Sequence, residues 1–289
     1  MITVFTPTYN RAYCLSNLYE SLCEQIYKEF EWIIVDDGSS DNTEELVKSF
    51  IDEQKIAIRY IRQVNGGKHR AINRGVKEAR GELFFIVDSD DTLPKDSLEI
   101  VKQEADTINW GSGLFVGLSG VLVDKKGCSI GGGLGKESIV SNAIDIRYEH
   151  KVKGDMAEVW RTEILSQYPF PTFDGENFIT EAVVWFRMAQ KYVVKYFNKP
   201  IYQAEYLSDG LTSNIRRIHR NSPLGSMLYC LEMISNEHIP FGAKVKAAIN
   251  YWRYTITYQG KRPTELKPRW WMYAFLLPGY YFYQKDIKR

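Results

Sequence analysis

The first hundred residues alternate between two patterns of hydrophobic positions. Four short apolar runs have the length of buried strands, and they lie at 2–6, 32–35, 56–61 and 83–87. Between them, apolar residues recur at steps of three and four, which predicts helices at 12–27, around 44–50 and at 68–80. Strands that alternate with helices through short loops predict a largely parallel sheet covered by helices on both faces.

Polar residues follow each of these predicted strands. The four groups are 7–10 (PTYN), 36–38 (DDG), 65–68 (NGGK) and 88–91 (DSDD). Parallel strands end at the same edge of a sheet, and ligands bind beyond that edge. We therefore expect the four groups to converge on one crevice.

The last of these groups has the composition of a cation site. Asp88 and Asp90 follow a buried strand, and alternation directs both carboxylates to the same side. Hard oxygen ligands of this kind suit Mg²⁺ or Mn²⁺, which usually needs substrate phosphates to complete its shell. The alternative is a loop that caps the following helix, with Asp91 or Thr92 as its first residue.

The other groups favour a nucleotide. One of Asp36 and Asp37 can accept hydrogen bonds from a base or ribose, while the other forms a turn with the Gly and Ser that follow. Tyr9 offers a flat face to a base, or only packs. Lys68 follows two glycines at a helix N-terminus, where it can meet a phosphate or remain a solvated charge. The chain has neither GxGxxG nor GxxxxGK[ST], which argues against dinucleotide oxidoreductases and P-loop enzymes.

Composition excludes several classes of protein. The 289 residues include 37 basic and 36 acidic ones, a balance that argues against nucleic acid as the main partner. Four cysteines without zinc-like spacing indicate free thiols in a reducing cytosol. The start reads as a strand rather than a signal peptide, and no run of 18 apolar residues is present. We expect a cytoplasmic protein without a membrane span.

The C-terminal tail differs from the body in its composition. Residues 270–283 carry no charge and eight aromatic side chains, and from Lys261 onward seven basic residues face two acidic ones. Fourteen residues are too few to span a bilayer, but Trp and Tyr with flanking Lys and Arg favour its interface. This predicts a peripheral contact with the inner face of the cytoplasmic membrane. The alternatives are that the aromatic side chains pack on the protein or form a homodimer contact.

Four segments together resemble the family-two glycosyltransferases of GT-A fold. They are TPTYNR, VDDGSSDNTEEL, NGGKHRAINRGVKEARGE and FIVDSDD, and they cover the first hundred residues. A later stretch, FPTFDGENFITEAVVWFRMAQKY, resembles the acceptor side of bacterial members that build surface polysaccharides. The resemblance implies an α/β fold with a Rossmann-like, mostly parallel sheet and a helical C-terminal extension.

This resemblance, together with a mostly helical pattern beyond residue 222, predicts a division of the chain into three segments. We expect a catalytic domain at 1–215, with a donor half at 1–110 and an acceptor half at 111–215, and a helical region at 216–289.

The resemblance also implies roles for residues of the crevice. Pro7 and Tyr9 would lie against the nucleobase and Asp37 would bind it, whereas Lys68 would sit near the base or diphosphate. Asp88 would contact the ribose.

The same resemblance implies a metal ion, Mn²⁺ or Mg²⁺. Asp90 would hold the cation that bridges the donor's phosphates, with Asp91 nearby. Some GT-A enzymes use a late histidine as a further ligand, which makes His219 a candidate. The alternative is that residues 216–220 (RRIHR) form a solvated basic loop.

A catalytic base is implied at Glu181. Many members have a Glu-Asp pair with an Arg six residues after the Asp, and here Arg187 lies six after Glu181, so that Thr180 takes the Glu position. Glu181 would accept the proton of an acceptor hydroxyl as it attacks opposite the leaving nucleoside diphosphate, which inverts the anomeric configuration. The alternative is a carboxylate that only stabilises a helix N-terminus.

The expected activity is therefore the transfer of one sugar from a nucleoside diphosphate sugar, UDP being the commonest in the family. The acceptor would be a hydroxyl of a glycan or a lipid-linked saccharide, and Asp155 is a candidate for the lining of its pocket. Single addition is expected because the QxxRW motif and multiple spans of processive synthases are missing. A sugar-nucleotide nucleotidyltransferase and a non-catalytic nucleotide-sugar-binding protein remain the alternatives.

Overall fold

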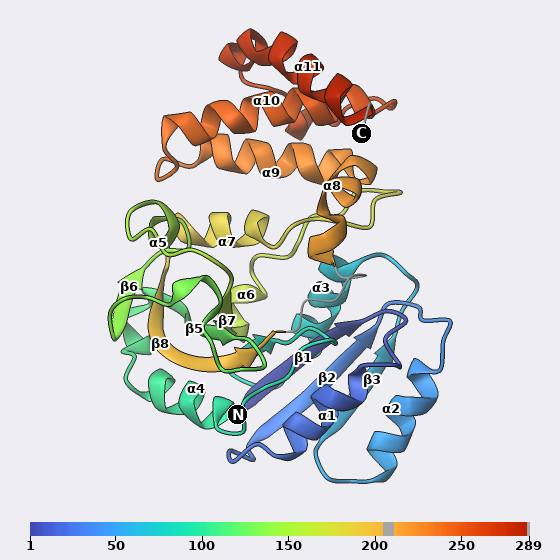
Figure 1. Cartoon of the computed structure of the whole chain (residues 1–289), viewed down its shortest axis with the longest axis vertical. Coiled ribbons are helices and arrows are strands. Elements are labelled where there is room, and N and C mark those ends of the chain that lie inside the picture. Colours follow the sequence, from blue (N-terminus) through green and yellow to red (C-terminus); the bar gives the residue numbers. More distant parts are fainter. Residues whose placement is uncertain (205–210, 288–289) are drawn as a thin grey trace.

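One mixed sheet organises residues 1–204 and 211–287, which are the residues that the computed structural model describes (Figure 1). Its strand order is β3-β2-β1-β4-β7-β5-β8-β6. The strands are β1 (Ile2–Thr8), β2 (Phe30–Asp36), β3 (Ile58–Arg62), β4 (Leu83–Ile86), β5 (Phe115–Val123), β6 (Ser138–Ser141), β7 (Met156–Arg161) and β8 (Val193–Gln203).

Helices lie on both faces of this sheet and beyond it. Those of the sheet are α1 (Leu15–Cys23), α2 (Thr43–Asp52), α3 (Lys68–Glu78), α4 (Ser97–Asp106), α5 (Asp145–Tyr148), α6 (Thr162–Leu165) and α7 (Ala182–Ala189). Those of the C-terminal region are α8 (Leu211–Asn221), α9 (Pro223–Ser235), α10 (Phe241–Thr257) and α11 (Leu276–Ile287), with short 3₁₀ turns η3 (Thr264–Leu266) and η4 (Trp270–Phe275).

The N-terminal half of the sheet has the predicted topology. Strands β3, β2, β1 and β4 are all parallel, so their carboxyl ends share one edge. The four strands and three helices lie where the hydrophobic pattern predicts them, with shifts at their ends. The first helix is shorter than the predicted 12–27, because after Cys23 the backbone turns to pair with a later loop, Ile26 N–H donating to the Lys95 carbonyl at 2.9 Å.

The second half of the sheet is mixed. Strand β7 lies between β4 and β5 and is antiparallel to both, whereas β8 runs parallel to β5 and β6 pairs antiparallel with β8. Strands β3, β2, β1 and β4 thus form a parallel half of the sheet, and the strands beyond β4 form a mixed half. Strands β7 and β8 consequently bring residues from beyond position 150 to the edge where the polar loops gather.

Alternating side chains divide the interior into two apolar cores. Val4, Trp32 and Phe85 face α1, α2 and α4, while Phe5 and Phe84 face α3 and the C-terminal region. All five are fully buried, as expected for strands covered on both faces. This packing fixes the strand ends rigidly, which positions the loops that follow them.

The C-terminal helices form a layer beyond α7 (Figure 1). Glu176 links this layer to the sheet, because its carboxylate accepts the Leu224 and Gly225 N–H groups at 2.7 and 2.9 Å, at the start of α9. Residues 216–220, expected as a basic loop, belong instead to helix α8. The boundary expected at 215–216 falls inside that helix, and a division of the chain near α8 stays a proposal.

Gly67 brings the loop between β3 and α3 against the later segment around Asn177. Its φ is +93°, and a Cβ placed on it would lie 1.8 Å from the Asn177 carbonyl oxygen. Only glycine meets both conditions, since a side chain would be strained and would also push a backbone away.

We expect Gly67→Ala to lower the free energy of unfolding by about 2–4 kcal/mol, from strain and overpacking together. Gly127→Ala is the matched control, because Gly127 has φ +77° but no atom within 4 Å of its ideal Cβ. Urea unfolding of the two variants tests this. Equal losses would contradict the close approach at Asn177.

Candidate active site

A cavity of about 970 Å³ opens at the carboxyl ends of the parallel strands. All four predicted polar groups contribute to its lining, through residues such as Tyr9, Asp37, Lys68 and Asp90. Its size is at the upper end of the range of about 300–1,000 Å³ found for small-molecule sites. Residues of β7, β8 and α7 close the opposite side of the cavity.

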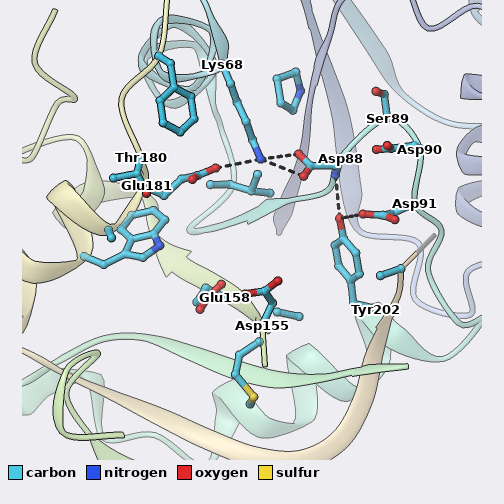
Figure 2. A pocket seen from close by; sticks show the side chains of 18 of the residues that line it. Lys68, Asp88, Ser89, Asp90, Asp91, Asp155, Glu158, Thr180, Glu181 and Tyr202 are labelled. Atoms are coloured by element: carbon cyan, nitrogen blue, oxygen red, sulfur yellow. Dashed lines mark hydrogen bonds and ion pairs between the residues drawn. The ribbon is translucent and has the colours of Figure 1, made fainter. Parts of the chain in front are cut away.

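Lys68 lies between two carboxylates in this cavity (Figure 2). Its Nζ is 2.7 Å from Asp88 Oδ1 and 2.9 Å from Glu181 Oε1. Burial alone would lower the pKa of Lys68, but the charges of Asp88 and Glu181 outweigh it and raise that pKa above its ordinary value. The lysine therefore stays charged and connects the end of β4 to the start of α7.

Glu181 precedes the first turn of α7 and reaches into the cavity beside Thr180. Burial would raise the pKa of its carboxyl, but the adjacent Lys68 ammonium lowers it below the ordinary value. Glu181 is thus ionised, as a proton acceptor must be, and its basicity depends on how closely Lys68 stays bound.

Tyr202 of β8 connects two of the cavity's aspartates (Figure 2). Its hydroxyl donates to Asp91 Oδ2 at 2.6 Å and accepts the Asp88 backbone N–H at 3.0 Å. Burial, together with these carboxylates, raises the pKa of Tyr202 well above its ordinary value. Asp91 is therefore held through a tyrosine that the sequence pattern did not single out.

Asp90 also lines the cavity, and burial and the charge of Asp88 raise the pKa of its carboxyl. Within residues 1–204 and 211–287, no group of three or more His, Cys, Asp or Glu side chains has metal-binding geometry. The carboxylates Asp90 and Asp91 nonetheless have the hard oxygen chemistry of an Mg²⁺ or Mn²⁺ site that takes its remaining ligands from substrate phosphates. The residues present fit such an ion.

Of Asp36 and Asp37, one is expected to accept hydrogen bonds from a base or ribose and the other to form a turn. The Asp37 carboxylate accepts the Gly66 and Gly67 N–H groups at 2.9 and 2.6 Å and the Gln63 side-chain amide at 2.7 Å, so it orders the loop that precedes Lys68. It still lines the cavity, with one acceptor site left on Oδ2. Asp36 is fully buried and accepts hydrogen bonds from Ser39 N–H and the Tyr60 hydroxyl.

Pro7 and Tyr9 form the wall next to Asp37. Tyr9 is 49% exposed, which leaves its ring accessible to a planar ligand. Pro7 pairs in register with Val35 and is fixed by the sheet.

His219 and Arg187 lie outside the residues that line the cavity. His219 Nδ1 is 2.8 Å from Ser226 Oγ, and its ring packs against Phe178 and Tyr254. Burial lowers the pKa of this imidazole. The geometry does not bring His219 to Asp90 and Asp91, and its contacts are those of a helix-packing residue.

Arg187 likewise points away from Glu181. Its guanidinium binds Glu232 of α9 at 2.6–2.7 Å, which joins α7 to the C-terminal layer. Arg187, which lies six residues after Glu181 in the motif, thus connects two helices and does not contact Glu181.

Sequence reasoning missed Glu158, Trp160 and Trp185, which line the cavity opposite Lys68. One signal was present: Glu158 occupies an inward position of β7 between Met156 and Trp160, where an apolar side chain would be expected. Asp155, named as an acceptor-side residue, also lines this part.

Comparisons with known proteins agree with this geometry. The profile of glycosyl transferase family 2 matches residues 3–109. The glycosyltransferase GlyG of Streptococcus pneumoniae is 37% identical over 105 residues, which are 36% of this chain and 35% of that protein. The GalNAc(5)-diNAcBac-PP-undecaprenol β-1,3-glucosyltransferase of Campylobacter jejuni is 27% identical over 227 residues, 75% of this chain and 70% of its own. The match to GlyG thus spans about a third of that relative's length.

Two solved structures extend the likeness beyond the matched segment. S. aureus TarS 1-349 in complex with UDP-GlcNAc has a TM-score of 0.62 at 19% identity, covering 96% of this chain and 79% of that one. The mannosyltransferase PcManGT of Pyrobaculum calidifontis, in complex with GDP-Man and Mn²⁺, has a TM-score of 0.58 at 18% identity, covering 99% and 87%. The fold is GT-A with a helical C-terminal region. Residues 3–109 are thus similar to glycosyl transferase family 2.

Proposed function

We propose that this protein transfers one sugar from a nucleoside diphosphate sugar, a UDP-sugar foremost, to a hydroxyl of a glycan or lipid-linked saccharide in surface polysaccharide synthesis. The observation that carries the proposal is one cavity in which the carboxylates Asp88 and Glu181 both bind Lys68. The names of the C. jejuni relative and of S. aureus poly(ribitol-phosphate) β-N-acetylglucosaminyltransferase TarS, which describe transfer to a lipid-linked saccharide and to a polymer, support this substrate class.

The donor lies along the carboxyl ends of β1, β2 and β4 in this proposal. Its base contacts Pro7, Tyr9 and Asp37, its ribose contacts Asp88, and its phosphates face Lys68. Asp90 and Asp91 hold Mn²⁺ or Mg²⁺, which when bound offsets the negative charge of the diphosphate as a Lewis acid.

Glu181 is the base of this reaction. The acceptor oxygen bonds to the anomeric carbon, the bond from that carbon to the diphosphate oxygen breaks, and the acceptor proton passes to the Glu181 carboxylate. A diphosphate near Lys68 competes for its ammonium, which weakens the Lys68–Glu181 pair and raises the pKa of Glu181 toward that of a more effective base. Donor binding thus prepares the base. Attack opposite the leaving group inverts the configuration.

We expect Glu181→Gln to lower kcat by about 10²- to 10⁴-fold, because general-base assistance is lost. Release of UDP from UDP-GlcNAc, UDP-glucose and UDP-galactose, and of GDP from GDP-mannose, measures turnover with water or an added glycoside as acceptor. UDP affinity should be equal or higher, because Lys68 no longer pairs with a Glu181 carboxylate.

Glu163→Gln serves as the control, since Glu163 is exposed and does not line the cavity. Full activity of Glu181→Gln would remove the base assignment. So would retention of the donor's anomeric configuration in the released sugar, observed by NMR. Nucleotide-sugar binding without turnover in wild type would favour a non-catalytic binding protein, and synthesis of a nucleotide sugar from its triphosphate would favour a nucleotidyltransferase.

We also infer a peripheral membrane contact through the C-terminal surface, defined here as η4, α11 and the start of α10. Among described residues, no helix is long and apolar enough to cross a bilayer. Part of the tail packs on α10, where Trp252 Nε1–H donates to the Met272 carbonyl at 2.6 Å. Large apolar side chains nevertheless remain in solvent, with Trp270 85%, Leu277 76% and Phe241 71% exposed.

Charge favours an anionic bilayer over other occupants of this surface. Exposed basic residues occur in the same C-terminal part of the chain as the apolar side chains, namely Lys246, Lys261, Lys267, Arg269 and Lys285. Of the acidic residues there, Glu265 is exposed and Asp286 is paired with Arg253. Lys288 and Arg289 lie outside the described residues. Exposed apolar side chains with basic residues before and after them in the chain match a lipid headgroup layer, and a second copy would bring like charges together.

The double variant Trp270→Ser/Leu277→Ser should bind vesicles containing phosphatidylglycerol at least tenfold more weakly, because two large apolar side chains no longer insert. Val140→Ser on β6 is the control, a 55% exposed apolar residue elsewhere. Vesicle co-sedimentation measures this. Undiminished binding would contradict the membrane contact, and a dimer that this variant dissociates would assign the surface to a second copy.

A further inference from the structure

The proposed reaction leaves two carboxylates of the cavity without a role, Asp155 and Glu158, and Glu158 is the less exposed of the two. Glu158 lies on β7 with Met156 and Trp160, all three on the same face and all lining the cavity. Figure 2 shows Glu158 across the cavity from Lys68. Met156 and Trp160 are buried in the core, so Glu158 is a charged group in an otherwise apolar row.

Other polar groups lie beside Glu158 across the sheet. Its partner in register on β5 is Ser119, whose own partner on β8 is Tyr196, another residue of the cavity lining. The Ser119 hydroxyl and the Trp160 ring N–H are buried and have no hydrogen-bond partner among the described residues. Ser119 does not line the cavity, so the polar side chains that a ligand meets on this side are those of Glu158 and Tyr196.

The electrostatics of Glu158 suit a neutral polar ligand. Burial raises the pKa of its carboxyl to about 7, with Asp155 and Glu181 adding to the rise and Arg147 opposing it. The Arg147 guanidinium donates to the backbone carbonyls of Val152 and Gly154, which holds it as a distant partner only. A carboxyl that titrates near neutrality can both donate to and accept from a hydroxyl.

An aromatic wall completes this side of the cavity. The Trp185 ring lies 4.4 Å from that of Trp160, centroid to centroid, and both line the cavity. Sites for small molecules combine such apolar walls with a few placed polar groups, and the apolar face of a sugar ring fits against an indole.

We propose that Glu158 is a specificity-determining residue that binds a hydroxyl of a pyranose ring seated between Glu181 and the Trp160–Trp185 wall. The inference rests on the proposed function and adds the sugar subsite to it. Two rings meet at the base, the donor's sugar and the acceptor's, and both present this chemistry. The effect of Glu158 substitutions on donor affinity and on the acceptor KM shows which of the two rings Glu158 binds.

The test uses Glu158→Gln and Glu158→Ala in the full chain, with Glu163→Gln as control. Affinities are measured for UDP and for UDP-GlcNAc, UDP-glucose and UDP-galactose, and transfer is followed to a panel of p-nitrophenyl glycosides. If the ring belongs to the donor, affinity for the preferred UDP-sugar falls about tenfold while that for UDP is unchanged. If it belongs to the acceptor, donor affinities are unchanged and the glycoside KM rises about tenfold.

A purely structural role predicts a different result. Glu158 is half-buried and has no ion pair among the described residues, so Glu158→Gln should leave the thermal midpoint at pH 8 equal or higher. A lower midpoint would indicate that the carboxylate stabilises the fold. Unchanged donor affinities, sugar preference and glycoside KM would overturn the proposal. If wild type binds neither UDP nor any UDP-sugar, the proposed function itself fails, which is a separate outcome.

Discussion

The ion pairs of Lys68 with Asp88 and Glu181 are the interaction on which the site depends. Asp88 follows the parallel half of the sheet and Glu181 precedes α7, so one ammonium connects the end of β4 to the start of α7. Two carboxylates facing one cavity would repel each other without it. In the proposed reaction, the same ammonium keeps Glu181 ionised but weakly basic, and a diphosphate that competes for Lys68 would link donor binding to the strength of the base.

The acidic residues around Lys68 have different roles because their hydrogen-bond partners differ. Asp36 and Asp37 accept hydrogen bonds that shape loops, and Asp91 is oriented by Tyr202. Asp90 keeps its carboxylate toward the cavity, next to Asp88. The donor side is thus rich in carboxylates and suits a cation with phosphates, while the opposite side, with indoles and Glu158, suits a sugar.

Sequence alone was sufficient for the part of the site that parallel topology dictates. Strands that end at one edge bring Tyr9, Asp37, Lys68 and Asp90 together whatever the details of packing. Residues such as Tyr202 could not be foreseen, because they reach the cavity through mixed pairing whose register no local pattern specifies.

Motif spacing likewise located Glu181 but could not orient its neighbours. Arg187 turns to Glu232, and His219 packs between aromatic rings of the C-terminal layer, since tertiary contacts decide where a helical side chain points. The most direct measurement is the thermal midpoint of wild type and Asp90→Asn with UDP, GDP, CMP and dTDP, each with and without Mn²⁺. The account predicts that one nucleotide, UDP foremost, raises the midpoint of wild type in a Mn²⁺-dependent way, and that Asp90→Asn loses the dependence. No shift with any nucleotide would contradict the assignment of this cavity as a donor site.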